Sequence, residues 1–234
     1  MHNSGWVQAP GSAILGDSLR HYELKNYIKG VINHFANDNR IVGWDLYNEP
    51  DNFAPFDPRY PDIGPDVKKK SIYSLSLLKK TFQWAREVNP SQPLTLGLWK
   101  NADTWIVKDS LSPIDKFAVS NSDVISFHAY GNINETRKKI ENLEKYNRPL
   151  LCTEYLARGQ ENTFQNMLPL FKEKGIAAIN WGFVAGKTNT VFPWSSWQEE
   201  FDSLPEVWHH DIYLPDKTPF DQKEIDFLKE ILIN

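Results

Sequence analysis

Residues 41–50, IVGWDLYNEP, decide the fold of this chain. The first seven are mostly apolar and include β-branched and aromatic side chains, which is typical of a strand. The run then ends in Asn48, Glu49 and Pro50, so polar groups stand where the strand stops. Because apolar and polar residues do not alternate cleanly along the run, the pattern favours a strand covered on both faces, as in a parallel sheet.

Four more runs of this kind follow, with helical patterns between them. The predicted strands span residues 41–47, 94–99, 124–130, 149–155 and 176–183. Apolar residues three and four positions apart predict helices at 19–35, 72–88, 112–119, 140–146, 164–171 and 225–232. Glycine and proline mark residues 1–16 and 51–65 as loops, and the segment 186–208, which is rich in tryptophan and serine, is predicted as another. Strands that alternate with helices predict an α/β fold with about five parallel strands and flanking helices.

Size and composition narrow the class of protein. The 234 residues are predicted to form one domain over 1–234, and the net charge of −4 argues against a nucleic-acid partner. A membrane span needs a run of about 18 apolar residues, and no apolar run in this sequence approaches that length. The one cysteine, Cys152, lies in a predicted strand and is expected in the core. Residues 1–10 show no signal-peptide pattern, and the localisation stays open.

Polar side chains recur at the ends of the predicted strands. Glu49 ends the first strand and Glu154 the fourth, with His128 and Tyr130 at the end of the third and Trp181 in the fifth. The carboxyl ends of parallel strands meet at one edge of the fold, where active sites lie. If the sheet curls into a barrel, the two glutamates face each other across its mouth. Paired carboxylates across a cleft are the machinery of glycoside hydrolysis.

The same residues carry a family resemblance. WDLYNEP at 44–50 resembles the acid/base motif on the fourth barrel strand of clan A glycoside hydrolases. SFHAY at 126–130 resembles the sixth strand, TEY at 153–155 the nucleophile strand, and Trp181 the tryptophan of the eighth. The chain most resembles glycoside hydrolase family 5, the cellulase-like group, over its whole length. The resemblance implies a TIM (β/α)8 barrel that is incomplete here, with strands four to eight and no counterpart of the first three βα units.

The resemblance also implies roles for individual residues. Glu49 would be the general acid/base and Glu154 the nucleophile. Tyr130 would orient Glu154, and Trp181 would form the platform under the reacting sugar. Substrate contacts are implied at Asn48, His128, Tyr130, Trp181, Trp99 and Trp6, with Trp105 as a further candidate. Because two carboxylates about 5–5.5 Å apart do not both ionise easily, we expect Glu49 to hold the proton once Glu154 is charged.

The predicted function is therefore retaining hydrolysis of β-glycosidic bonds in a plant-type polysaccharide or oligosaccharide, of the cellulase, mannanase or xylanase kind, without a metal or cofactor. One alternative is a truncated, inactive or carbohydrate-binding remnant of such an enzyme. Another is a metal-dependent barrel hydrolase that uses His128, His209, His210 and carboxylates, which is disfavoured because adjacent histidines on a strand would face opposite ways. The unpaired edges at 41–47 and 176–183 predict self-association of the chain.

Overall fold

The computed structural model describes residues 1–3, 9–52, 67–100 and 111–233. Trp6, Trp105 and most of the predicted loop 51–65 lie outside the described residues. Within them, five strands occur at the predicted places. They are β1 (Trp44–Asp45), β2 (Leu94–Thr95), β3 (Ile125–Ala129), β4 (Leu150–Tyr155) and β5 (Ala177–Ala178).

The five strands run parallel and follow one another in chain order. β1 pairs with β2, and β3, β4 and β5 form a second sheet in that order. A parallel bridge between Leu98 and Phe127 joins the two sheets. β1, β2 and β5 are each only two residues long and so shorter than predicted, because several of their flanking residues are held by single backbone bonds, such as Trp181 N to Tyr155 O at 2.9 Å. The prediction of parallel βα units is confirmed.

Helices separate the strands, with some corrections to the predicted bounds. The short helix α1 (Ser12–Leu15) lies in a segment that was predicted as loop, and η6 (Trp194–Trp197) lies in the predicted loop 186–208. The predicted helix at 19–35 is divided into η1 (Arg20–Leu24) and α2 (Lys25–His34). The remaining helices are α3 (Val67–Val88), α4 (Pro113–Asn121), α5 (Ile133–Glu144), η5 (Arg158–Gln160), α6 (Phe164–Glu173) and α7 (Gln222–Ile233).

Side-chain caps fix where the central helices begin. Ser112 accepts a hydrogen bond from the backbone N–H of Asp115 at the start of α4, with Pro113 as the first helical residue. α5 starts with a capping box in which Asn132 and Glu135 bond each other's backbone N–H groups. These caps satisfy N–H groups that the helix leaves unpaired. α5 begins at Ile133, shortly after β3 ends at Ala129.

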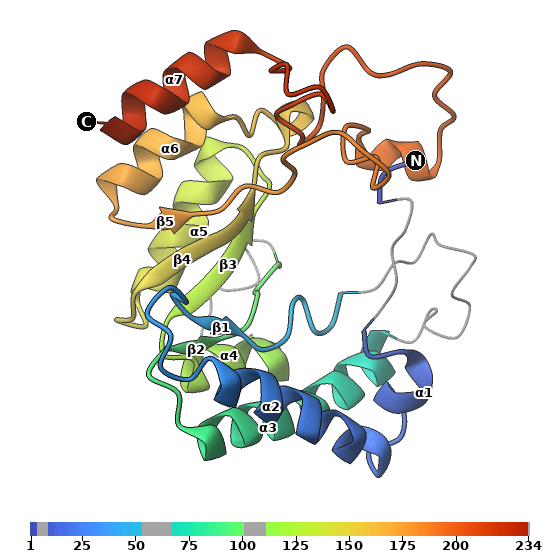
Figure 1. The fold of residues 1–234 in the computed structure, drawn as a ribbon, viewed down its shortest axis with the longest axis vertical. Helices are drawn as coiled ribbons and strands as arrows, with labels where there is room; N and C mark the ends of the chain where they lie inside the picture. The colour runs from blue at the N-terminus through green and yellow to red at the C-terminus, as the bar shows by residue number, and fades with distance from the viewer. Residues whose placement is uncertain (4–8, 53–66, 101–110, 234) are drawn as a thin grey trace.

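The helices cover one side of the curved row of strands (Figure 1). α2 packs against α3 beside β1 and β2, while α5 packs on β3 and α6 on β5. One apolar core continues from Ile32 to Ile225, and Phe127, Phe164 and Phe171 are among its largest fully buried side chains. Cys152 is fully buried there, as the sequence predicted. No described helix is both long enough and apolar enough to cross a membrane.

The last strand exposes a row of apolar side chains. Ile179, Trp181 and Phe183 are 56%, 39% and 64% exposed, and they alternate along the chain that continues β5. Ile179 and Trp181 donate their backbone N–H groups to carbonyls of β4, so these two alternate side chains share one face, whereas Gly182, with a φ of +82°, turns the chain before Phe183. Apolar rows beside an unpaired strand edge are surfaces through which chains associate. Self-association of this chain stays a prediction.

Candidate active site

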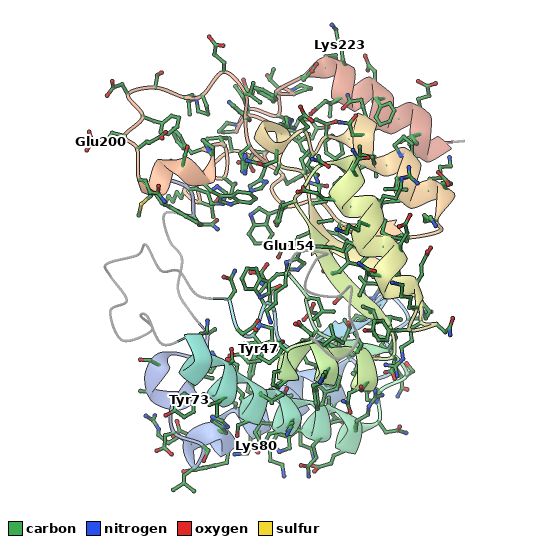
Figure 2. The ribbon with its side chains drawn as sticks, turned by 180° about the vertical axis from the view of Figure 1, so that it is seen from behind. Tyr47, Tyr73, Lys80, Glu154, Glu200 and Lys223 are labelled. Atoms are coloured by element: carbon green, nitrogen blue, oxygen red, sulfur yellow. The ribbon has the colours of Figure 1, made fainter. Side chains whose placement is uncertain are left out.

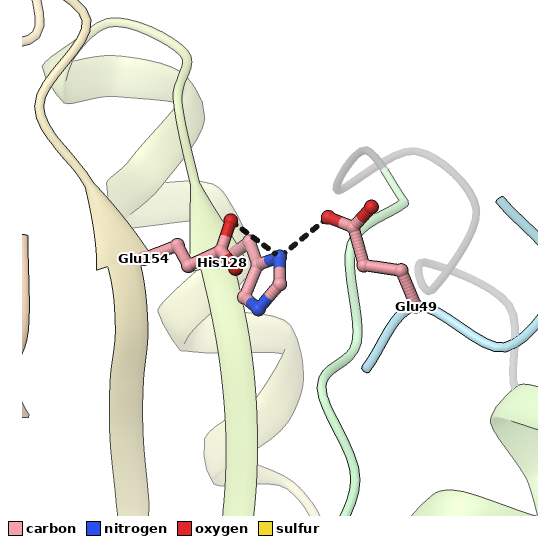
Figure 3. Close-up of side chains that lie close together, drawn as sticks. All are labelled: Glu49, His128 and Glu154. Carbon is pink, nitrogen blue, oxygen red and sulfur yellow. Dashed lines mark hydrogen bonds and ion pairs between the residues drawn. The ribbon is translucent and has the colours of Figure 1, made fainter. Parts of the chain in front are cut away.

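Two carboxylates meet beside one imidazole at the carboxyl ends of the strands. Glu49 follows β1, Glu154 lies in β4, and His128 of β3 lies between them (Figure 3). Nδ1 of His128 is 2.5 Å from a carboxylate oxygen of Glu49 and 3.3 Å from one of Glu154. The three atoms lie within 4.8 Å of one another. Figure 2 shows Glu154 between the half of the molecule with Tyr47 and Tyr73 and the half with Glu200 and Lys223.

Glu49 is held by a tight turn at the end of β1. Its φ angle is +43°, in the left-handed region that non-glycine residues seldom adopt. Its backbone N–H bonds the carbonyl of Gly97 at 3.1 Å, and the amide of Asn52 donates to its second carboxylate oxygen. Backbone strain of this kind, about 1–3 kcal/mol, collects at functional sites. The turn therefore aims the Glu49 carboxylate at His128.

Glu154 is the more deeply set of the two carboxylates. Burial raises the pKa of Glu154 to about 7, against the lowering effect of His128, and the charge of Glu49 raises this pKa further. Tyr130 donates a hydrogen bond to Glu154 at 2.7 Å, the bond that the sequence predicted. The expectation that Glu49 holds the proton once Glu154 is charged stays a prediction.

A metal centre was one alternative for these histidines. Glu49, His128 and Glu154 form a described group whose ligand atoms are close enough to hold an ion. His209 and His210 lie outside that group. Their rings are 4.4 Å apart in an irregular segment, so the expectation that they face opposite ways on a strand does not apply to them. Burial lowers the pKa of His209 to about 4 and that of His210 to about 2, so both are neutral imidazoles packed among aromatic rings.

The sequence around this site matches a known protein family. Residues 1–187 match the family model described as Cellulase (glycosyl hydrolase family 5). The chain belongs to glycosyl hydrolase family 5. The resemblance in the strand-end motifs is therefore confirmed at the level of the family. No curated protein matches the sequence.

Solved structures show the barrel fold of this family 5 chain. It resembles xylanase 10B from Thermotoga maritima with a TM-score of 0.59 and 17% identity, over 98% of this chain and 74% of that one. It resembles the GH10 xylanase from Thermobacillus composti with a TM-score of 0.56 and 14% identity, over 97% and 73%. An endo-1,4-beta-xylanase from Caldicellulosiruptor owensensis matches with a TM-score of 0.51 and 18% identity, over 86% and 66%. The incomplete TIM-barrel class is thereby confirmed.

The other predicted substrate residues of the family 5 chain are placed as follows. Asn48 is exposed next to Gly97 at the end of β1. Trp181 is partly exposed at the end of the β5 segment. Trp99 gives its indole N–H to Asp51 at 2.9 Å, which leaves its ring faces for other contacts. The contacts of these residues with a sugar remain predictions.

Three residues near the site were missed at the sequence level. Asn52 bonds Glu49, and the side chain of Lys70 bonds the backbone carbonyl of Asn52. The lysine run 68–70 looks like a solvated helix face in sequence, but burial lowers the pKa of Lys70, which lies near Glu49 and Asp51. Trp194 packs its ring edge-on to Tyr130, with ring centroids 5.3 Å apart. The tryptophan-rich composition of 186–208 was the only signal for it.

Gly97 gives a test of how tightly the site is packed. A Cβ atom at this position would lie 2.8 Å from Oδ1 of Asn48 and 3.0 Å from Nε2 of His128. We expect Gly97→Ala to displace both side chains and to lower kcat/KM by about tenfold or more, since misplacement of about 1 Å is costly in an active site. Gly30→Ala is the control, because a Cβ atom there meets nothing within 4 Å. Equal kcat/KM for both variants would contradict this packing.

Proposed function

We propose that this family 5 chain hydrolyses β-glycosidic bonds of a plant-type polysaccharide or oligosaccharide with retention of anomeric configuration. The observation that carries the proposal is the approach of the Glu49 and Glu154 carboxylates to within 4.8 Å. Retaining glycosidases place their two carboxyl groups about 5–5.5 Å apart, whereas inverting enzymes leave about 6.5–9.5 Å for a water molecule. The spacing favours direct attack by a carboxylate.

The two steps assign a role to each carboxyl group. In the first step, Glu154 attacks the anomeric carbon while Glu49 gives its proton to the leaving oxygen, so one C–O bond forms as the other breaks. In the second step, Glu49 takes a proton from water, and the water oxygen displaces Glu154 from the sugar. Glu154 is assigned as the nucleophile because TEY at 153–155 resembles the nucleophile strand of the family and because Tyr130 donates a hydrogen bond that orients its carboxylate. Burial and the charge on Glu154 raise the pKa of Tyr130 well above its usual value, so it remains a donor.

The family and the structural neighbours support the substrate class. The family model is named for cellulase, and three of the structural neighbours are named as xylanases. Release of reducing ends from β-glucan, mannan and xylan would test the proposal, with Glu154→Gln as the blank. We expect release from at least one polymer. Binding of a polymer without any release by the wild-type chain would instead support the carbohydrate-binding remnant.

The raised pKa of Glu154 predicts the acid limb of the pH profile. Only the ionised carboxylate can attack, and the pKa of Glu154 is about 7. We therefore expect kcat/KM to fall about tenfold per pH unit below about pH 7, when measured from pH 5 to 9 with an activated aryl glycoside. Because the charge of Glu49 raises the pKa of Glu154, Glu49→Gln should move this midpoint to lower pH. A wild-type midpoint near pH 4.5 would contradict the account.

A further inference from the structure

The end of β3 leaves the regular ladder just where the site begins. The pairing of β3 with β4 is shifted between Phe127 and His128, and Tyr130 lies beyond the last paired residue. The carbonyl of His128 instead accepts a bond from Nζ of Lys139 at 2.7 Å. The carbonyls of the next residues accept from the amide of Asn162, at 2.8 Å for Ala129 and 2.6 Å for Gly131. Side chains thus hold the segment that carries His128 and Tyr130.

Lys139 is an unusual residue for its position on α5. It is only 6% exposed and shares the buried face of the helix with Thr136, Ile140 and Leu143. A buried ammonium group is costly unless it is well bonded, and an apolar side chain would pack there at less cost. Burial lowers the pKa of Lys139 to about 8. Electrostatic interactions with Cys152, Glu49 and Glu135 raise the pKa of Lys139 and partly offset the effect of burial.

Asn162 connects this segment to the end of β4. It is fully buried and follows η5. Its side-chain oxygen accepts a bond from the N–H of Leu156 at 2.8 Å, and its backbone carbonyl accepts one from Ala157 at 2.9 Å. Leu156 comes two residues after Glu154. One side chain therefore bonds the exits of both strands that supply the candidate site.

We propose that Lys139 and Asn162 are positioning residues that clamp the exits of β3 and β4. The clamp keeps His128 and Tyr130 at bonding distance from Glu154, at 3.3 Å and 2.7 Å. The bonds of Lys139 and Asn162 go to backbone groups of the strand ends, so each side chain acts on the site through the backbone. The inference rests on the proposed function, because the value of this positioning lies in the reaction at Glu154.

The lysine half of the clamp is tested with Lys139→Met, which keeps the length of the side chain and removes its donors. We expect kcat to fall about 10- to 100-fold, because His128 and Tyr130 move relative to Glu154. KM should stay within about threefold, because the predicted sugar contacts outside the clamped segment, such as Asn48 and Trp181, keep their places. Lys139→Arg keeps donors and should recover part of kcat. Lys145→Met is the matched control, since Lys145 is exposed at the end of the same helix and bonds Asn142.

The asparagine half is tested with Asn162→Asp, which keeps an acceptor for Leu156 and removes the donor to Ala129 and Gly131. A fall in kcat of about tenfold or more is expected. Asn166→Asp is the control, because Asn166 is exposed and its amide bonds the carbonyl of Glu161. Circular dichroism at the assay temperature gives the folded fraction, so that kcat refers to folded protein.

A second readout separates this proposal from the proposed function. The ¹⁵N chemical shifts of the His128 ring, recorded by NMR at one fixed pH, should change in Lys139→Met and stay as in the wild type in Lys145→Met. Wild-type protein without turnover would count against the proposed function alone, and the His128 signals would still decide the clamp. Unchanged His128 signals, or an unchanged kcat per folded molecule in both clamp variants, would overturn the clamp.

Discussion

Replacing Glu154 with glutamine is expected to lower kcat by about four orders of magnitude or more. A neutral amide cannot form the covalent bond to the anomeric carbon, and in the proposed mechanism Glu49 serves as the acid/base rather than as a second nucleophile. The loss should be the same for polysaccharides and for activated aryl glycosides, because both need the nucleophile. The loss is measured from initial rates on one substrate of each kind, at enzyme concentrations high enough to detect a residual activity of about 10⁻⁴ of the wild-type value.

Stability measurements show whether this variant is folded. The raised pKa of Glu154 means that its charged form is disfavoured in the folded protein, so the folded state binds more protons than the unfolded state between about pH 4.5 and 7. The carboxylate thus costs stability above pH 7, by up to about 3 kcal/mol. Glu154→Gln should be as stable as the wild type or more stable in urea at pH 8, with no gain below about pH 4.5.

A control and a contradicting result complete this prediction. Glu144→Gln changes an exposed carboxylate on α5 that pairs with Lys174 at 3.0 Å, and it should leave kcat unchanged. If the folded Glu154→Gln protein kept more than about 1% of the wild-type kcat, Glu154 would not be the nucleophile.

Replacing Glu49 with glutamine should separate substrates by their leaving groups. Sugar leaving groups need the proton of Glu49, so hydrolysis of a polysaccharide should fall by about 10²- to 10⁴-fold. An activated aryl glycoside has a leaving group that departs without a proton, so its first step should be retained within about tenfold. The ratio of the two rates, measured by the burst of phenol and by reducing ends, is the test.

A small anion such as azide tests the role of Glu49 as general base in the second step, the hydrolysis of the glycosyl-enzyme. In Glu49→Gln the glycosyl-enzyme lacks its general base, so azide, which needs no deprotonation, should attack it and restore turnover of the aryl glycoside. The product should be a β-glycosyl azide. If Glu49→Gln lost both substrates equally and azide gave no recovery, the division of roles between Glu49 and Glu154 would be wrong.

The sequence predicted the order of the strands and the residues of the site, but it did not predict the lengths of the strands or the pKa of Glu154. Apolar runs ending in Glu49, His128 and Glu154 are local patterns, and the rule that parallel strands end at one edge brings them together. The structure confirms that these three side chains meet. The lengths of β1 and β5 were not predictable, because they depend on neighbouring strands rather than on the residues of the strand itself.

Electrostatics and the clamp depend on tertiary structure and were missed for that reason. The pKa of Glu154 is raised by its burial, which no local sequence pattern measures. Lys139 left a signal, since a lysine stands on the apolar stripe of α5 beside Ile140 and Leu143, positions that a packing argument fills with apolar residues. Asn162 left none, because an asparagine in a loop is ordinary until its bonds to both strand ends are seen.

The most direct test of the central claim is to trap the covalent intermediate. A 2-deoxy-2-fluoro β-glycoside with an activated leaving group slows both steps but leaves formation of the glycosyl-enzyme faster than its hydrolysis. Mass spectrometry of the intact protein and of its peptides should then show one added sugar, carried by the peptide that contains Glu154 and absent from Glu154→Gln. A sugar attached to another residue, or turnover that releases a product of inverted anomeric configuration, would contradict the account.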